Sequence, residues 1–289
     1  MDPNEIVTKL PVLSPRGADS NKGDYGRVLV VAGSRGMTGA AILCGTAALR
    51  GGAGLVRLAV PASEQVIIAC GNPCYMTVAL PCDEQGRLDT RAATEFVQLF
   101  GANDAAAVGP GLGQSEGSTA CVHGALSSPI ALVLDADGLN VLRGETSPLR
   151  NRGAPLILTP HPGEFARLIR SDTRTVQARR EELSTGFAAA HGLVLVLKGH
   201  ATLVTDGRRL YRNITGNPGM ATGGSGDVLT GLIAALLGQG LDAFAAAQLG
   251  VYLHGLAGDL ARDALGEVSL IASDLIEFLP RAFVHRQTA

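Results

Sequence analysis

A glycine-rich segment in the last third of the chain carries the clearest chemical pattern. It spans Asn217–Asp227 and reads NPGMATGGSGD. Gly223, Gly224 and Gly226 let the backbone adopt positive φ and approach a ligand closely. Apolar residues recur at helical spacing from Val228 onwards, so the glycines directly precede a helix N-terminus. The free N–H groups and the dipole of that terminus predict a site for a phosphate or for a developing phosphoryl charge.

Asp227 lies in the first turn of this helix and has two interpretations. It could cap the helix, which Asp does well. It could instead accept the proton of a hydroxyl group while the amides hold the phosphoryl oxygens, as phosphoryl transfer requires. We favour the second, because the segment contains more glycine than a cap needs. The segment is not a P-loop, and Gly33–Gly36 after the first strand candidate lacks the order GxGxxG.

Polar residues follow three other predicted strands. Asp135 with Asp137, then His161, then Lys198 each come after a buried strand candidate. In open α/β sheets, ligands bind outside the carboxyl ends of the strands. The two carboxylates could approach Mg²⁺ through water, although a helix cap by Asp137 is the competing interpretation. Lys198 offers a point charge for phosphate oxygens or is a solvated turn residue. A lone His such as His161 is more often an ordinary hydrogen-bonded residue.

The elements that must position these residues alternate along the chain. Buried strand candidates are separated by helical patterns, and an antiparallel hairpin is predicted around Asp206-Gly207. The strand candidates cover residues 27–32, 55–60, 75–80, 105–108, 130–134, 156–158, 193–197, 200–205 and 209–214. This rhythm predicts an α/β fold with a largely parallel sheet and a hairpin at one end. We expect residues 1–20 to form an irregular lead-in and residues 21–289 a single domain.

Several shorter segments accompany the signature in a fixed order. They are Lys22–Gly26, Val30–Ser34, Met37–Ala40, Gly51–Gly54, Gly109–Gly113, Leu134–Asn140, Thr159–Glu164 and Leu197–Thr202. With the signature, they resemble the NAD(P)H-hydrate dehydratase family of the ribokinase-like superfamily, from about residue 20 to 280. One departure is Met37, where relatives often carry Tyr. The resemblance implies a ribokinase-like fold with helices on both faces of the sheet.

The resemblance also implies an enzyme that repairs hydrated nicotinamide cofactors. Its substrates are the S epimers of hydrated NADH and NADPH, called NADHX and NADPHX. A nucleotide phosphorylates the C6 hydroxyl, phosphate then leaves, and the C5=C6 double bond returns. Bacterial members use ADP and give AMP and phosphate, whereas eukaryotic relatives use ATP, so we expect an ADP-dependent, Mg²⁺-requiring lyase. The sequence lacks the N-terminal epimerase domain of many bacterial relatives, so we expect a separate epimerase as its functional partner.

Site residues follow from the same resemblance. Asp227 is the expected base, with Gly224 and Gly226 in the anion hole. The expected substrate-binding residues are Ala40, Gly111, Gly113, His161 and Asp227. The expected nucleotide-binding residues are Lys198, Gly199, His200, Ala201, Thr202 and Gly226. Glu164 matches a glutamate near magnesium in related sugar kinases, and Asp135 is a second candidate that would act through water. For Glu164, a first-turn residue that satisfies the helix dipole is the competing interpretation.

Composition excludes several classes of protein. The 289 residues are 46% hydrophobic and 17% charged, which rules out a disordered chain. A net charge of -2, no Trp and 4% aromatic residues argue against a nucleic-acid partner. The apolar stretches are too short to span a membrane. Five cysteines without a CxxC pair suit reduced thiols, so we expect a cytoplasmic location.

Two other functions are compatible with the sequence. One is an ATP-dependent kinase of the same superfamily that acts on a vitamin precursor, which the HPGE and NPGM segments disfavour. The other is a catalytically silent nucleotide-binding regulator, which would not need Asp227. Relatives form homo-oligomers, so the resemblance also implies an oligomer, most simply a tetramer.

Overall fold

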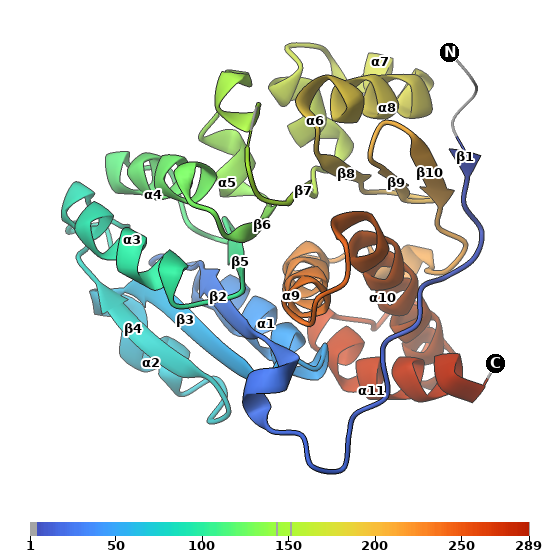
Figure 1. Cartoon of the computed structure of the whole chain (residues 1–289), viewed down its shortest axis with the longest axis horizontal. Coiled ribbons are helices and arrows are strands. Elements are labelled where there is room, and N and C mark those ends of the chain that lie inside the picture. Colours follow the sequence, from blue (N-terminus) through green and yellow to red (C-terminus); the bar gives the residue numbers. More distant parts are fainter. Residues whose placement is uncertain (1–4, 143, 151, 289) are drawn as a thin grey trace.

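The computed structural model describes residues 5–142, 144–150 and 152–288. Within these residues, ten strands form one sheet in the order β1-β10-β9-β8-β7-β6-β5-β2-β3-β4 (Figure 1). The strands are β1 (Glu5–Ile6), β2 (Arg27–Val31), β3 (Leu55–Pro61), β4 (Met76–Leu80), β5 (Ala105–Val108), β6 (Ala131–Leu134), β7 (Leu156–Leu158), β8 (Val194–Leu197), β9 (Leu203–Thr205) and β10 (Arg209–Arg212).

The strand directions confirm the predicted fold class. Strands β2 to β8 pair in parallel, whereas β9 pairs antiparallel with both β8 and β10. The hairpin therefore lies towards one end of the sheet, as Asp206-Gly207 predicted. Strand β9 begins only at Leu203, because residues 199–202 form a turn instead of continuing the strand. Within the expected lead-in, β1 adds a short parallel strand to β10.

Helices cover both faces of the sheet. They are α1 (Thr38–Arg50), α2 (Gln65–Ala69), α3 (Ala93–Gly101), α4 (Glu116–Ser127), α5 (Asp137–Asn140), α6 (Pro162–Leu168), α7 (Thr173–Ala178), α8 (Arg180–His191), α9 (Ser225–Gly238), α10 (Ala243–Leu265) and α11 (Ala272–Thr288). Along β2, Val28 and Val30 pack into a core with α1, α9, α10 and α11, whereas Leu29 and Val31 face the core that contains α3, α4, α6 and α8. A strand buried on both faces explains why its sequence is a continuous apolar run.

Helix α9 occupies the centre of one layer (Figure 1). It contacts α1, α10 and the strands β2, β5 and β6. A Cβ at Gly231 would lie 2.0 Å from the carbonyl oxygen of Cys44 on α1, so the two helices approach each other at backbone distance. The C-terminal Gly238 lies against Val28 at the start of β2, and Gly226 lies against Asp135, just after β6. The helix therefore runs opposite to the strands and brings its N-terminus to their carboxyl ends.

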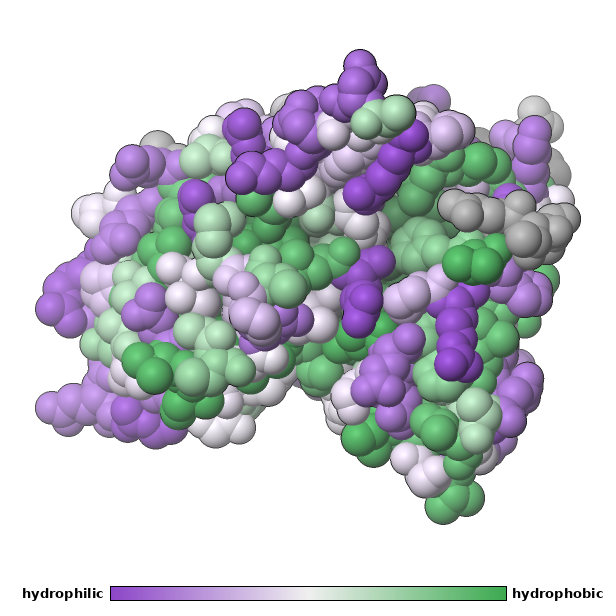
Figure 2. Space-filling view, turned by 90° about the horizontal axis from the view of Figure 1, so that it is seen from below, coloured by the Kyte–Doolittle hydropathy of each residue, from purple (hydrophilic) through white to green (hydrophobic). Residues whose placement is uncertain are grey.

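The surface mixes polar and apolar residues. Figure 2 shows one face on which hydrophilic residues line the upper edge and the outline is indented between two lobes. Along the described parts of the chain, no helix combines the length and the apolar character that crossing a bilayer requires.

Candidate active site

The glycine-rich segment ends at the N-terminus of α9. Gly224 is the N-cap, with φ of 93° and no capping side chain. A Cβ at Gly224 would lie 2.5 Å from Cδ1 of Leu43, so glycine is required both by conformation and by space. Behind the turn, Nε2 of His254 donates to the carbonyl oxygen of Ser225 at 2.9 Å. Burial lowers the pKa of His254 to about 4, so this core histidine stays neutral and fixes the start of the helix.

Asp227 is the third residue of α9, and it does not cap the helix. Its carboxylate has no hydrogen-bond partner in the part of the chain that the structure describes. Burial raises the pKa of Asp227 to about 7; the charge of Asp135 adds to the rise, and Lys198 opposes it. A carboxyl group with a pKa near neutral pH is suited to accept a proton from a hydroxyl group.

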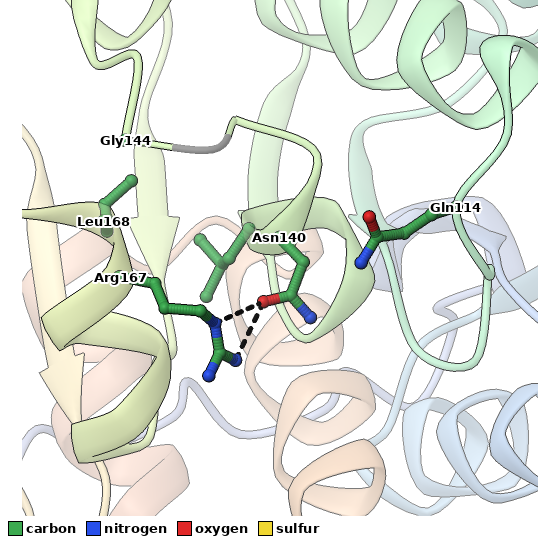
Figure 3. Close-up of a pocket in the computed structure, with 6 residues that line it drawn as sticks. Gln114, Asn140, Gly144, Arg167 and Leu168 are labelled. Atoms are coloured by element: carbon green, nitrogen blue, oxygen red, sulfur yellow. Dashed lines mark hydrogen bonds between the residues drawn. The ribbon is translucent and has the colours of Figure 1, made fainter. Parts of the chain in front are cut away.

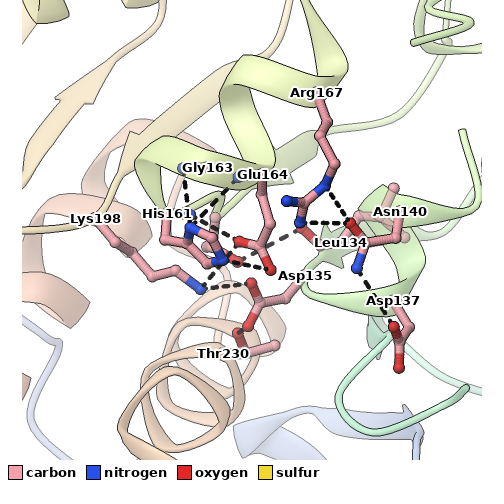
Figure 4. A network of polar contacts seen from close by, with 11 residues as sticks. Leu134, Asp135, Asp137, Asn140, His161, Gly163, Glu164, Arg167, Lys198 and Thr230 are labelled. Atoms are coloured by element: carbon pink, nitrogen blue, oxygen red, sulfur yellow. Dashed lines mark hydrogen bonds and ion pairs between the residues drawn. The ribbon is translucent and has the colours of Figure 1, made fainter. Parts of the chain in front are cut away.

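Lys198 is held by carboxylates from two different strand ends (Figure 4). Its Nζ donates to Oδ1 of Asp135 at 2.8 Å and lies 3.8 Å from Oε2 of Glu164. Thr230, one turn after Asp227 on α9, donates its hydroxyl to Oδ2 of Asp135 at 2.7 Å. Burial lowers the pKa of Lys198, but the two carboxylates raise it by more, so the ammonium stays charged.

Gly226 lies against this ion network. A Cβ at this position would lie 3.2 Å from Nζ of Lys198 and 3.8 Å from Oδ2 of Asp135. Because glycine has no side chain, the first turn of α9 can lie directly beside the ammonium group. The structure thus brings together Gly226, Lys198 and Asp135, which the sequence placed in three separate segments.

Helix α6 begins with a reciprocal cap formed by His161 and Glu164. Nδ1 of His161 accepts the N–H groups of Gly163 at 3.0 Å and Glu164 at 3.3 Å, and Oε2 of Glu164 accepts the His161 N–H at 2.7 Å. The first-turn interpretation of Glu164 is therefore confirmed, and the same carboxylate also faces Lys198. In the neutral imidazole this arrangement leaves the proton on Nε2, at the end of a side chain that is 51% exposed.

Asp137 has a role that neither of its two interpretations anticipated. Ala136, not Asp137, is the N-cap of α5. Oδ2 of Asp137 accepts the N–H of Gly113 at 2.9 Å, so the carboxylate fixes the turn after β5. In the same turn, a Cβ at Gly111 would lie 2.8 Å from Cβ of Ala40. Ala40, Gly111 and Gly113 therefore lie together on the side of the candidate site next to α5.

The segment 198–202 forms a turn between β8 and β9. Gly199 and Ala201 have φ of 126° and 48°. The hydroxyl of Thr202 donates to the Gly199 carbonyl oxygen at 2.9 Å, and His200 and Ala201 are exposed. Turns of this kind can present backbone N–H groups to an anion. The geometry is compatible with the expected nucleotide contact.

The acidic side chains at the site do not form a metal cage. Among the described residues, no group of three or more His, Cys, Asp or Glu is arranged to hold a metal ion. Both oxygens of Asp135 already accept hydrogen bonds. Even so, the charged groups that act on Asp227 are mostly negative: Asp135, Asp137 and Glu164 raise its pKa, and Lys198 lowers it. This surplus of negative charge fits Mg²⁺ that arrives with nucleotide phosphates and keeps several of its waters.

A cavity of about 360 Å³ lies beside the site and was not predicted from the sequence (Figure 3). It is lined by Gln114, Leu139, Asn140, Gly144, Arg167 and Leu168. The guanidinium of Arg167 donates to Oδ1 of Asn140 from Nε at 3.2 Å and from Nη2 at 2.9 Å. Sequence reasoning also missed Thr230. The available signal was spacing, because Asn140, Arg167 and Thr230 each follow a named site residue by three positions on a helix.

Comparisons with known proteins agree with this geometry. The family model for NAD(P)H-hydrate dehydratase matches residues 28–281. A bifunctional NAD(P)H-hydrate repair enzyme of Moorella thermoacetica is 46% identical over 271 residues, which are 93% of this chain and 51% of that protein. The chain thus spans about half the length of the bifunctional relatives that it matches. An ADP-dependent (S)-NAD(P)H-hydrate dehydratase of Neisseria meningitidis is 37% identical, over 91% of this chain and 87% of that protein.

Solved structures give the same result. The ADP/ATP-dependent NAD(P)H-hydrate dehydratase of Bacillus subtilis, co-crystallised with ATP and Mg²⁺, superposes with a TM-score of 0.84 at 35% identity over 94% of each chain. The expected ribokinase-like fold is confirmed by likeness to a solved member of that superfamily. The chain therefore belongs to the NAD(P)H-hydrate dehydratase family.

Proposed function

We propose that this protein dehydrates the S epimers of NADHX and NADPHX at the expense of ADP and returns NADH or NADPH, AMP and phosphate. The observation that carries the proposal is the position of Asp227. Its carboxylate has no hydrogen-bond partner among the described residues, its pKa is raised to about 7, and it lies at a helix N-terminus beside Lys198. The names of the Neisseria and Bacillus relatives support this activity and the nucleotide donor.

Asp227 takes the proton of the C6 hydroxyl as the oxygen attacks the β-phosphorus of ADP, and AMP leaves. The N–H groups of the first turn of α9 face the charge that develops on the phosphoryl oxygens. The lone pair of the ring nitrogen then expels phosphate from C6, and loss of a proton from C5 forms the C5=C6 bond. The net change removes one water from the hydrate and cleaves one phosphoanhydride bond.

We assign the turn 198–202 and Gly226 to the phosphates of the nucleotide. Lys198 supplies a fixed positive charge there, because Asp135 and Glu164 hold its Nζ. Glu164, and Asp135 through water, would approach a Mg²⁺ ion bound with the nucleotide, and such an ion would neutralise charge on the transferring phosphoryl group. Ala40, Gly111, Gly113 and His161 are the residues assigned to the hydrated dinucleotide.

We also propose that the protein forms a homo-oligomer. Leu265, Val268 and Ile271, around the junction of α10 and α11, are exposed apolar side chains, and their burial between copies would be favourable. Light scattering on the wild-type protein and on Val268→Asp tests this, with a tetramer expected for the wild type and smaller species for the variant. A separate epimerase as functional partner and a cytoplasmic location stay predictions from the sequence.

The decisive experiment mixes purified protein, S-NADHX and Mg²⁺ with ADP, with ATP or with neither, and follows the near-ultraviolet absorbance of the reduced nicotinamide ring. We expect a rise that needs ADP. A rise with ATP alone would support the dehydration reaction but show that the assignment of ADP as the phosphoryl donor is wrong. No rise with either nucleotide, from folded protein that binds nucleotide, would contradict the proposal.

Two variants complete this experiment. Asp227→Asn should lower kcat by about 100-fold or more while nucleotide binding survives, because general bases typically contribute that much. Asp19→Asn makes the same charge change at an exposed residue of the lead-in and should leave kcat unchanged. Equal activity of the two variants would favour a regulator without catalysis.

A further inference from the structure

We infer that Arg167, oriented by Asn140, binds a phosphate group of the hydrated dinucleotide. The inference rests on the proposed function and deepens it, because it names a substrate contact outside the residues that the family resemblance supplied. Three observations carry it: the position of the cavity, the charge of Arg167, and the place of Lys198 on the opposite side of the site.

The cavity is an extension of the candidate site. Asn140 follows Asp137 by three residues on α5, and Arg167 follows Glu164 by three residues on α6. One turn of each helix therefore separates the side chains of the site from those of the cavity, a distance of about 5 Å along the helix axis. A ligand as long as a dinucleotide must leave the reacting centre in some direction, and this cavity of about 360 Å³ adjoins it.

The charge of Arg167 is not neutralised within the described chain. Its two hydrogen bonds go to the neutral carboxamide of Asn140, and no ion pair to it is found among the described residues. By contrast, Arg87, which lies beside Gly113, is paired with Asp83 at 2.8 Å, and Arg35, which lies beside Gly86, is paired with Glu64 at 3.2 Å.

The guanidinium of Arg167 therefore keeps donors for a ligand. It has five N–H donors, and two of them are used by Asn140. The remaining ones have no partner among the described residues and can bind an anion, and a guanidinium prefers the oxygens of phosphate or carboxylate. Asn140 restrains the side chain without adding negative charge.

The two cations lie on opposite sides of the carboxylates. Figure 4 shows Lys198 on one side of Glu164 and Asp135, and Arg167 with Asn140 on the other. The phosphates of ADP are assigned to Lys198, and the C6 hydroxyl must reach Asp227. The dinucleotide carries its own diphosphate, and NADPHX carries a further 2′-phosphate. We assign these groups to Arg167, because its side chain lines the cavity.

The test compares Arg167→Gln and Arg167→Lys with Arg174→Gln, which removes the same charge from an exposed site on α7. KM is measured for S-NADHX, S-NADPHX and ADP, and urea unfolding is measured in parallel. We expect Arg167→Gln to raise KM for the dinucleotide about tenfold or more, as loss of a charged hydrogen bond predicts, with little change in kcat or in KM for ADP. Arg167→Lys should bind the dinucleotide better than Arg167→Gln but less well than the wild type, because lysine keeps the charge but not the planar set of N–H donors of a guanidinium.

The two substrates distinguish which phosphate is bound. An equal rise for S-NADHX and S-NADPHX identifies the diphosphate, and a rise confined to S-NADPHX identifies the 2′-phosphate; both results support the inference. Unchanged KM for both dinucleotides, or a rise confined to ADP, overturns it. A lower urea midpoint with unchanged KM would mean that Arg167 only ties α5 to α6, and would also overturn it.

An equilibrium measurement separates this inference from the proposed function. The chain contains no Trp, so the fluorescence of bound NADH or NADPH can be followed without a tryptophan signal. If wild-type protein shows no turnover, the proposed function fails, and this titration still decides the role of Arg167. A tenfold weaker affinity of Arg167→Gln for the dinucleotide supports the inference, and equal affinity overturns it.

Discussion

Lys198 and Arg167 flank the same group of carboxylates, yet the protein holds them in opposite ways. The side chain of Lys198 is 18% exposed and bonds to Asp135, whose side chain is 1% exposed, with Glu164 at 3.8 Å. Arg167 is exposed and, among the described residues, bonds only to the neutral amide of Asn140. One cation is part of the folded framework, whereas the other keeps its charge and most of its donors for a ligand.

Under the proposed function, this difference explains how one site can bind two anionic substrates. The buried cation sets the electrostatics of the reacting centre, because Lys198 lowers the pKa of Asp227 while Asp135 raises it. An exposed cation has little influence on a buried carboxyl, since water screens it. Catalysis and substrate binding can therefore be altered separately by changing one cation or the other.

The largest expected effect is on stability. Lys198→Met removes the counter-charge of two buried carboxylates, so we expect a loss of about 3–5 kcal/mol of unfolding free energy together with loss of turnover. Arg167→Met removes hydrogen bonds that an exposed guanidinium makes to a neutral, half-buried amide, and should cost about 1 kcal/mol or less. Urea unfolding at neutral pH measures both.

A double variant tests whether this loss comes from unpaired buried charge. In the double variant Asp135→Asn, Lys198→Met, one of the two buried carboxylates that lose their counter-charge is replaced by a neutral amide. This variant should recover part of the stability that Lys198→Met loses. If the Lys198 and Arg167 variants are equally stable, the distinction between a framework cation and a ligand-binding cation is wrong.

The next effect concerns Asp227 and pH. Its pKa in the folded protein, about 7, is above the ordinary value of 3.8. The folded protein therefore holds a proton that the unfolded chain releases, and the stability that this proton contributes is present below about pH 4 and is lost as pH rises through 7. As pH rises from about 4 through 7, the unfolding free energy of Asp227→Asn should therefore increase relative to that of the wild type. At pH 8 we expect this relative increase to be on the order of 1 kcal/mol or more.

The measurement is urea unfolding of both proteins at pH 5 and pH 8, without nucleotide or Mg²⁺. Arg167→Gln serves as the control, because Arg167 does not contribute to the shift at Asp227. A difference between wild type and Asp227→Asn that stays constant with pH would contradict a raised pKa.

Much of the fold could be predicted because it depends on local sequence pattern. The strands at Ala105–Val108 and Leu156–Leu158 have the predicted bounds, since a short continuous apolar run fixes each of them locally. The placing of Asp227 in a first helical turn was predictable for the same reason. That Asp227 does not cap the helix was also favoured from the surplus of glycine, and the structure gives the physical reason: Gly224 takes a left-handed conformation against Leu43 and is itself the N-cap.

The parts of the site that were missed depend on contacts between distant segments. Thr230 bonds to Asp135 across 95 residues of sequence, and neither residue indicates its partner. The hydrogen bond that the Gly113 N–H donates to Asp137, and the one that Arg167 donates to Asn140, likewise join separate elements. The cap by His161 was missed because His is not among the usual N-cap residues, although Glu164 three positions later completes the pattern of a capping box.

The smallest expected effect is the dependence of substrate binding on salt. Because Arg167 is exposed, its attraction for a phosphate should weaken as ionic strength rises from about 0.05 to about 0.5 M, raising KM for S-NADHX roughly two- to threefold. In Arg167→Gln this part of the salt dependence should be absent, whereas Arg174→Gln should behave as the wild type. Parallel salt curves for wild type and Arg167→Gln would mean that the phosphate of the substrate does not meet this guanidinium. A flatter curve in the Arg167 variant alone would place the screened charge in the cavity beside α6, and not at Lys198.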